Sequence, residues 1–323
     1  MSFSLSIMQS KESIHTQVDS NQAGSKAFEY PIPLEYNVIF GCPRSGTTFL
    51  FEALNALPNS ECSSGHLFPL ALAHLVNQNL SPEIYQCIAN SFEFSIQDYL
   101  EAVYGNRVTS IHKWLLKSMS TQELLQSLKA QRTIERFVYK EPFLAFSPEL
   151  VYNALPECRI IHIYRDGRDC ADSLARKYKV LTDEKLMTFK TAEMPLGRQY
   201  DHRYVPWWVE VGKEEAFMSY TPYIRSIWMW KEMVRRCHEF ISRPDVVASG
   251  RIMTVKYEDL VRSPLEHGEQ IVNHFRCDMT DQLRAKFKTA RQSSVNIHKR
   301  RDPEELKLAE EVAYEELTQY GYL

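Results

Sequence analysis

The chain lacks the features that define several large classes of protein. Its seven cysteines are odd in number and include no C-x-x-C pair, which argues against a disulfide framework or a zinc site and favours a reducing cytoplasm. No apolar run is long enough to span a bilayer, and the first thirty residues lack the basic start and apolar core of a secretory signal. The net charge of −3 gives no general attraction to nucleic acid or membrane. Any anion site must therefore be a local concentration of positive groups.

What remains is an ordinary globular composition, with 44% hydrophobic and 24% charged residues among 323. Residues 1–30 are rich in Ser, Gln, Asn and Lys and have few apolar groups, so we expect a flexible tail. No internal repeat or low-complexity linker follows. The sequence therefore predicts one domain over residues 31–323.

Four short runs rich in β-branched and aromatic residues predict strands, at 36–40, 136–140, 159–164 and 251–257. They are largely continuous in hydrophobicity rather than alternating, which is typical of strands buried on both faces of a parallel sheet.

Helical patterns lie between these runs. Apolar residues at helical spacing mark a helix over 223–240. A capping box at 263–266 and a similar start at 302–305 predict two more helices, the last one stopping near Gly321. Strands that alternate with helices indicate an α/β fold with a central parallel sheet flanked by helices, in which ligands bind at the carboxyl ends of the strands.

A glycine-bounded loop, residues 41–48 (GCPRSGTT), follows the first strand and precedes an apolar helical pattern. Its spacing matches the phosphate-binding pattern G-x-x-x-x-G-K-[ST], in which backbone amides hold the anion. Thr47 occupies the lysine position, and Arg44 supplies a positive charge within the loop instead. The missing lysine argues against a magnesium-dependent ATPase or kinase.

A second motif ends the third predicted strand, at residues 164–169 (YRDGRD). Arginine at a strand end is suited to bidentate contacts with phosphate. We expect Asp169 to cap the following helix, which places Ser173 near its start. A surface salt-bridge cluster is the alternative interpretation.

Together these motifs resemble the sulfotransferase family that uses 3′-phosphoadenosine-5′-phosphosulfate (PAPS), in its bacterial-type, P-loop-like form. Residues 43–48 look like the family's 5′-phosphosulfate loop. The resemblance implies that the backbone of Ser45, Gly46, Thr47 and Thr48, with the threonine hydroxyls, holds the phosphosulfate. It also implies that Arg165 and Ser173 bind the 3′-phosphate. Fixed positive groups can neutralise the phosphate that leaves during transfer, so we expect no metal.

Three further segments resemble the family. Tyr257, in YEDL at 257–260, matches a tyrosine near the nucleotide. Lys299 and Arg300 match a late basic loop that closes over the nucleotide, although the Arg-Lys-Gly signature of the animal cytosolic branch is absent, and a solvated charge run is the alternative. Lys140, at the end of a strand, matches a lysine that reaches the bridging oxygen.

The catalytic base is not specified by these matches. In the animal cytosolic branch a histidine follows two residues after the strand-end lysine, and here that position is Pro142. His66 is one candidate, because histidine as a residue type titrates near neutrality. Glu141 is a second, if burial raises its pKa, and His112 is a more distant one. Arg44 and Lys140 are placed to meet charge that develops on the leaving phosphate.

The acceptor regions are the least specified. Residues 62–131 and 181–219 match the family weakly and are expected to be helical insertions that bind the acceptor. Trp207 and Trp208 could form a wall of the acceptor pocket or pack on the core. The sequence predicts transfer to a hydroxyl or nitrogen of a small molecule, which the bacterial motif spelling suggests is a microbial secondary metabolite. A P-loop kinase and a non-catalytic nucleotide-binding relative are the alternatives, and oligomeric state is not specified.

Overall fold

The computed structural model describes residues 34–64, 80–100, 115, 120–122, 134–188 and 197–323. The predicted tail, His66 and His112 lie outside these ranges. No helix within them is long and apolar enough to cross a bilayer.

The described residues form a five-stranded sheet in the order β2-β3-β1-β4-β7, and every pair of neighbours is parallel. Its strands are β1 (Glu35–Phe40), β2 (Ser60–Ser64), β3 (Arg136–Lys140), β4 (Arg159–Tyr164) and β7 (Ile252–Lys256). Val38, Ile39 and Phe40 of the central strand are fully buried, as expected of a strand covered on both faces. The predicted α/β class and the four predicted strands are confirmed.

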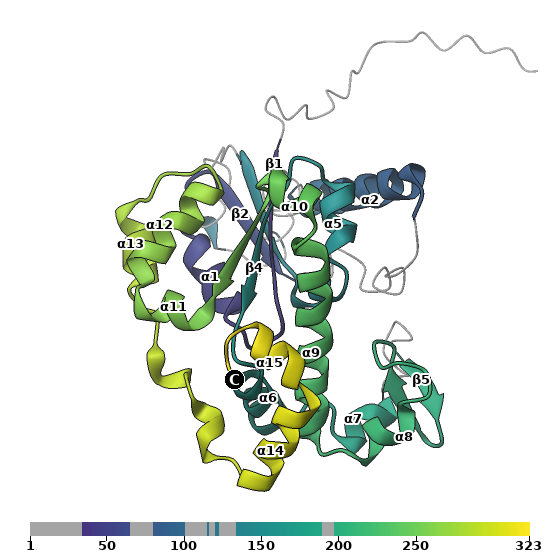
Figure 1. Ribbon diagram of the computed structural model, residues 1–323. Coiled ribbons are helices and arrows are strands. Elements are labelled where there is room, and N and C mark those ends of the chain that lie inside the picture. The colour runs from purple at the N-terminus through teal and green to yellow at the C-terminus, as the bar shows by residue number, and fades with distance from the viewer. Residues whose placement is uncertain (1–33, 65–79, 101–114, 116–119, 123–133, 189–196) are drawn as a thin grey trace, which may run out of the picture. The chain divides into compact units, whose positions relative to one another are not determined.

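Helices cover both faces of this sheet (Figure 1). One face packs its apolar side chains against α1 (Thr47–Leu54), α11 (Tyr257–Arg262), α12 (Pro264–His274) and α13 (Asp281–Phe287). The other face is covered by α2 (Pro82–Leu100), the 3₁₀ turn η3 (Pro142–Phe146), α5 (Pro148–Ala154), α9 (Pro222–Ile241) and α10 (Pro244–Ser249).

The remaining elements lie near the carboxyl ends of the strands, at the bottom of Figure 1, or beside the lower end of α9, at the lower right. They are α6 (Gly167–Ser173), the π-helical turn η4 (Leu174–Tyr178), α7 (Asp183–Thr188), the antiparallel pair β5 (Gly197–Tyr200) and β6 (Arg203–Pro206), α8 (Glu214–Ser219), the 3₁₀ turns η6 (Gln292–Ser294) and η7 (Ile297–Arg300), α14 (Pro303–Val312) and α15 (Tyr314–Gln319).

Several local predictions need correction. Asp166, not Asp169, caps α6, because its carboxylate accepts from the amide of Arg168 at 3.0 Å. Ser263 stands at the start of α12, but its side chain makes no capping hydrogen bond. The predicted last helix is two helices, since the backbone breaks at Ala313. The insertion at 181–219 contains the β5–β6 pair as well as helices.

Arg225 of α9 fixes the insertion at 181–219 to the sheet layer. Its guanidinium is buried and donates to the carbonyls of Leu181, Phe217 and Met218 at 2.6–3.0 Å. It also lies 3.0 Å from a carboxylate oxygen of Asp183. One side chain therefore provides hydrogen-bond donors for carbonyls of two separate segments, one at Leu181 and one at the end of α8.

We expect Arg225→Met to lower the unfolding free energy by roughly 2–4 kcal/mol, because it leaves buried carbonyls without donors. Chemical denaturation measures this change. Arg262→Met is the control, since in the described ranges Arg262 forms an exposed ion pair with Asp259, and its substitution should be nearly neutral. Equal effects of the two substitutions would contradict the structural role given to Arg225.

Candidate active site

The strand register brings the loop at 41–48 and the predicted motifs at 139–142, 164–169 and 257–260 to one edge of the sheet. Ile39 pairs with Lys140, Phe40 with His162, and Tyr164 with Lys256. The segments that follow these strands begin at positions 41, 141, 165 and 257, and they meet because the strands are parallel.

Two glycines allow the loop at 41–46 to lie against its neighbours. Gly41 has φ 153°, and a Cβ there would sit 2.0 Å from the carbonyl oxygen of Ile163. Gly46 has φ 106°, and a Cβ there would sit 2.5 Å from the ring of Tyr257. Any side chain at either position would push the loop away from β4 or α11.

The loop leaves backbone donors at the start of α1. Gly46 is the N-cap and offers no side chain, and within the described ranges the amides of Thr47, Thr48 and Phe49 have no hydrogen-bond partner. The Ser45 hydroxyl is already used, because it donates to the Ile163 carbonyl at 3.0 Å. Ser45 can therefore offer a ligand its backbone but not its hydroxyl, whereas the amides that follow can bind an anion.

Arg165 lies buried directly beneath this loop, with 3% of its surface exposed. It donates to the carbonyl of Arg44 at 3.1 Å and to Asp169 at 3.1 Å, and its guanidinium lies 4.9 Å from the ring centre of Tyr257. It also donates to the carbonyl of Ser294. Its Nε has no partner within the described part of the chain, so one buried donor is left for a ligand.

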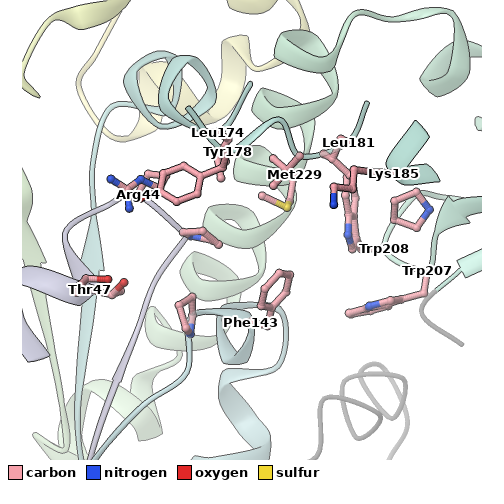
Figure 2. Close-up of a pocket in the computed structure, with 15 residues that line it drawn as sticks. Arg44, Thr47, Phe143, Leu174, Tyr178, Leu181, Lys185, Trp207, Trp208 and Met229 are labelled. Atoms are coloured by element: carbon pink, nitrogen blue, oxygen red, sulfur yellow. The ribbon is translucent and has the colours of Figure 1, made fainter. Parts of the chain in front are cut away.

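Ser173 contacts Arg44 rather than Arg165. The Nε of Arg44 donates to the Ser173 hydroxyl at 3.0 Å, and the guanidinium lies 4.5 Å above the ring of Tyr178. Arg44 has φ 78°, an uncommon conformation for a residue with a side chain. Ser173, the last residue of α6, and Tyr178 of the π-helical turn after it thus hold the arginine of the loop in a fixed direction. Figure 2 shows Arg44 beside Tyr178.

Asp169 binds a distant segment of the chain instead of capping α6 as predicted. Its carboxylate accepts from the amides of Asn296 and His298 at 2.8 and 3.0 Å, and an oxygen lies 2.6 Å from Nδ1 of His298. Burial would raise the pKa of Asp169, but the hydrogen bonds of His298 and the charge of Arg165 outweigh it and hold the pKa below its usual range. Asp169 therefore binds the segment at 294–298 to the strand edge.

Two cavities meet at the loop. A cavity of about 140 Å³ is bounded by Arg165, Tyr257, Ser294 and the start of α1. A larger one of about 450 Å³ runs from the loop toward Trp207 and Trp208 (Figure 2). Arg44, Thr47 and Thr48 line both cavities. A group held at these three residues is therefore accessible from both sides.

The other predicted residues lie at the periphery. Lys140 lies with its amine 5.4 Å from the ring centre of Phe51. Burial lowers the pKa of Lys140, and the charge of Arg44 adds to this effect, while Glu141 and Glu52 oppose it.

Glu141 is buried, and its carboxylate accepts from the amide of Phe143. Lys299 and Arg300 are exposed at the end of η7. Lys140, Glu141, Lys299 and Arg300 are not among the described residues that line either cavity. The roles given to Lys140, Glu141, Lys299 and Arg300 stay predictions.

The fold and the site define a class: an α/β protein whose loop after β1 offers unpartnered amides and an arginine suited to an anion, with a second cavity beside it. The family comparison is more specific. The model of the sulfotransferase family matches residues 38–220, which is more than half of the chain. The chain belongs to the sulfotransferase family.

Solved structures are similar at low identity. The sulfotransferase domain of the Synechococcus PCC 7002 olefin synthase is 16% identical, covering 88% of this chain and 96% of its own, with a TM-score of 0.45. The sulfotransferase domain of the curacin biosynthetic pathway is 17% identical, with 90% and 99% covered and a TM-score of 0.45. A sulfotransferase of Alicyclobacillus acidocaldarius is 14% identical, with 88% and 97% covered and a TM-score of 0.39. No curated protein matches the chain significantly.

The contacts of Asp169 predict a pH-dependent contribution to stability. Because its pKa is lower in the folded than in the unfolded chain, ionised Asp169 stabilises the fold above its unfolded value of about 3.9, and the contribution is lost as the pH falls. We expect Asp169→Asn to lower the unfolding free energy by about 1–3 kcal/mol at neutral pH, and by less below about pH 4. Denaturation over a range of pH measures the difference.

Asp201→Asn, in the exposed turn between β5 and β6, serves as the matched control and should leave stability unchanged at every pH. The prediction is contradicted if the loss of unfolding free energy in Asp169→Asn becomes larger as the pH falls. That result would show that the native contacts favour the protonated carboxyl.

Proposed function

We propose that the protein transfers a sulfuryl group from PAPS to a hydroxyl or nitrogen of a small-molecule acceptor. The observation that carries this proposal is that Arg44, Thr47 and Thr48 line both cavities. A transfer between two molecules requires a donor and an acceptor that meet at one point. We assign the phosphate groups of the donor to the smaller cavity and the acceptor to the larger one.

The residues of the smaller cavity suit the phosphate groups of such a donor, and its volume of about 140 Å³ takes only part of the nucleotide. The free amides at the start of α1 suit the 5′-phosphosulfate, and the unpartnered Nε of Arg165 suits an oxygen of the 3′-phosphate. The Ser294 carbonyl now accepts from Arg165, and its hydroxyl lies 2.8 Å from that of Tyr257.

In the proposed reaction the acceptor atom forms a bond to sulfur, and the bond between sulfur and the oxygen of the 5′-phosphate breaks. The electron pair stays on the phosphate, which leaves as part of adenosine 3′,5′-bisphosphate (PAP). Arg44 and the α1 amides stabilise the negative charge that develops there. Ser173 and Tyr178 keep the Arg44 guanidinium in place, so little reorganisation is needed during the reaction.

The acceptor proton needs a base. Among the described residues that line the two cavities there is no imidazole and no carboxylate. We assign the base to His66, which follows Ser64 by two residues in the sequence. Ser64 ends β2 and pairs with Lys140 at the edge of the sheet where the motifs meet.

The acceptor is proposed to be a microbial secondary metabolite, on the resemblance of the motifs to bacterial family members. The seven cysteines are all free thiols, which supports action in a reducing cytoplasm.

The donor site is tested by comparing PAP with AMP, which lacks the 3′-phosphate. We expect the wild type to bind PAP at least 100-fold more tightly in calorimetric titration, because charge-assisted contacts to the 3′-phosphate are strong. Arg165→Lys should reduce this ratio to about tenfold or less, while AMP binding changes little. Arg262→Lys, outside the site, is the control.

Equal binding of PAP and AMP by the wild type would refute the assigned donor. Binding of ATP with magnesium but not of PAP would favour the kinase alternative.

The base is tested by His66→Gln. We expect kcat to fall by roughly 10²–10⁴-fold, and the rise of kcat/KM with pH near 6–7 to disappear, while PAP affinity is unchanged. Rates over a range of pH provide the measurement, with the exposed His202→Gln as control. If His66→Gln keeps the wild-type pH profile, His66 is not the base. The base would then be Glu141, or the reaction would use no protein base.

A further inference from the structure

The larger cavity is apolar along most of its length. Its volume of about 450 Å³ lies within the roughly 300–1,000 Å³ typical of small-molecule sites. Figure 2 shows Arg44 and Thr47 at one end, Phe143 and Met229 along the middle, and Lys185 with the two tryptophans at the opposite end. A ligand that reaches the loop with its reacting atom therefore extends past these apolar side chains toward Lys185.

The charges that line this cavity have one sign. Of its described lining residues only Arg44 and Lys185 are charged, and both are positive. Arg44 is held at the loop by Ser173 and Tyr178. Lys185 forms no ion pair with any carboxylate in the described ranges. The cavity thus presents a cation at the end far from the reaction, with no anion of the described chain to neutralise it.

The acidic neighbours of Lys185 on α7 have other partners. Asp183 pairs with Arg203 at 2.8 Å and with Arg225 at 3.0 Å. The side chain of Glu184 is hydrogen-bonded by its own backbone and by Thr182, and these bonds lower its pKa. The lysine is therefore available to an anion from outside the chain.

The wall that carries Lys185 is fixed by packing. Trp208 is buried and stacks on Phe146, with ring centres 5.8 Å apart and planes 15° apart. Trp207 meets the same ring edge to face at 5.1 Å. Arg225 holds the carbonyl of Leu181 as well as Asp183 of α7. A cation on a wall fixed in this way loses less freedom on binding than a lysine on a loose loop.

We propose that the acceptor is an apolar molecule that carries a negative charge remote from the atom to be sulfated, and that Lys185 binds this charge. The proposal rests on the proposed function, since it assigns the acceptor to the larger cavity. Phe143, Trp207 and Met229 contact the apolar body, and Lys185 selects anionic over neutral or cationic acceptors. The side chains of Trp207 and Trp208 line the cavity and also pack against Phe146. The two predicted roles of this pair, pocket wall and core packing, are therefore compatible.

The test uses a series of ω-(4-hydroxyphenyl)alkanoates of increasing chain length, with their methyl esters and the matching amines. Binding is followed by tryptophan fluorescence, because Trp207 and Trp208 line the cavity. Each titration is run with and without PAP, so that the preference for charge is measured whether or not the donor site is assigned correctly. The proteins are the wild type, Lys185→Met, Lys185→Glu and Lys213→Met, an exposed lysine of the same insertion outside the lining.

We expect the carboxylate to bind about fivefold more tightly than its ester at the chain length that spans the cavity, as a partly exposed ion pair allows. The preference should disappear in Lys185→Met, shift to the amine in Lys185→Glu, and persist in Lys213→Met. Equal binding of carboxylates and esters at every length in the wild type would overturn the proposal, as would a preference that survives in Lys185→Met. Loss of PAP binding alone would instead count against the proposed function.

Discussion

The end of β4 holds the phosphate loop from two directions. The Ser45 hydroxyl donates to the carbonyl of Ile163, and Arg165, two residues further along, donates to the carbonyl of Arg44. The loop can approach this closely only because Gly41 has no side chain. Since Arg44 sits in an uncommon backbone conformation, these contacts stabilise a loop that would otherwise relax. The direction of the α1 amides and of Arg44 follows from this anchoring.

The same strand end also organises the segments that follow it. Arg165 contacts Asp169, and Asp169 binds the segment at 294–298, so that the late part of the chain closes the smaller cavity. On the other side Ser173 and Tyr178 direct Arg44 toward the larger cavity. Arg44 supplies a positive charge where a P-loop protein has its lysine charge, but from a different position in the loop. It lies between the two cavities, whereas a P-loop lysine lies beside a single triphosphate. This arrangement fits transfer from one small molecule to another.

Much of this arrangement could be predicted from local sequence. The continuous β-branched runs and the spacing of Gly41 and Gly46 predicted a parallel sheet with a phosphate loop, because these signals lie within a few neighbouring residues. Contacts between distant segments could not be predicted. Asp169 and His298 are 129 positions apart, and neither segment has a local pattern that predicts contact with the other. β2 was missed because its sequence, SECSS, is polar and has weak strand propensity.

The pocket wall was only partly predictable for a related reason. Trp207 and Trp208 stand out in the sequence, but the carbonyls that fix the wall belong to Leu181, Phe217 and Met218 and are gathered by one arginine of α9. Backbone acceptors carry no sequence signal. Lys185 is likewise one exposed lysine among many until the fold places it at the end of an apolar cavity.

Sulfuryl transfer is tested most directly by following labelled sulfur. The protein is incubated with ³⁵S-labelled PAPS and a mixture of hydroxylated and amino acceptors in the presence of a chelator, and the label is traced by chromatography. The account predicts label in an organic product together with release of an equal amount of PAP, both abolished when the loop is blocked by Gly46→Ala. Label that stays on PAPS, with phosphate transferred from ATP to the same acceptors once magnesium is restored, would contradict it.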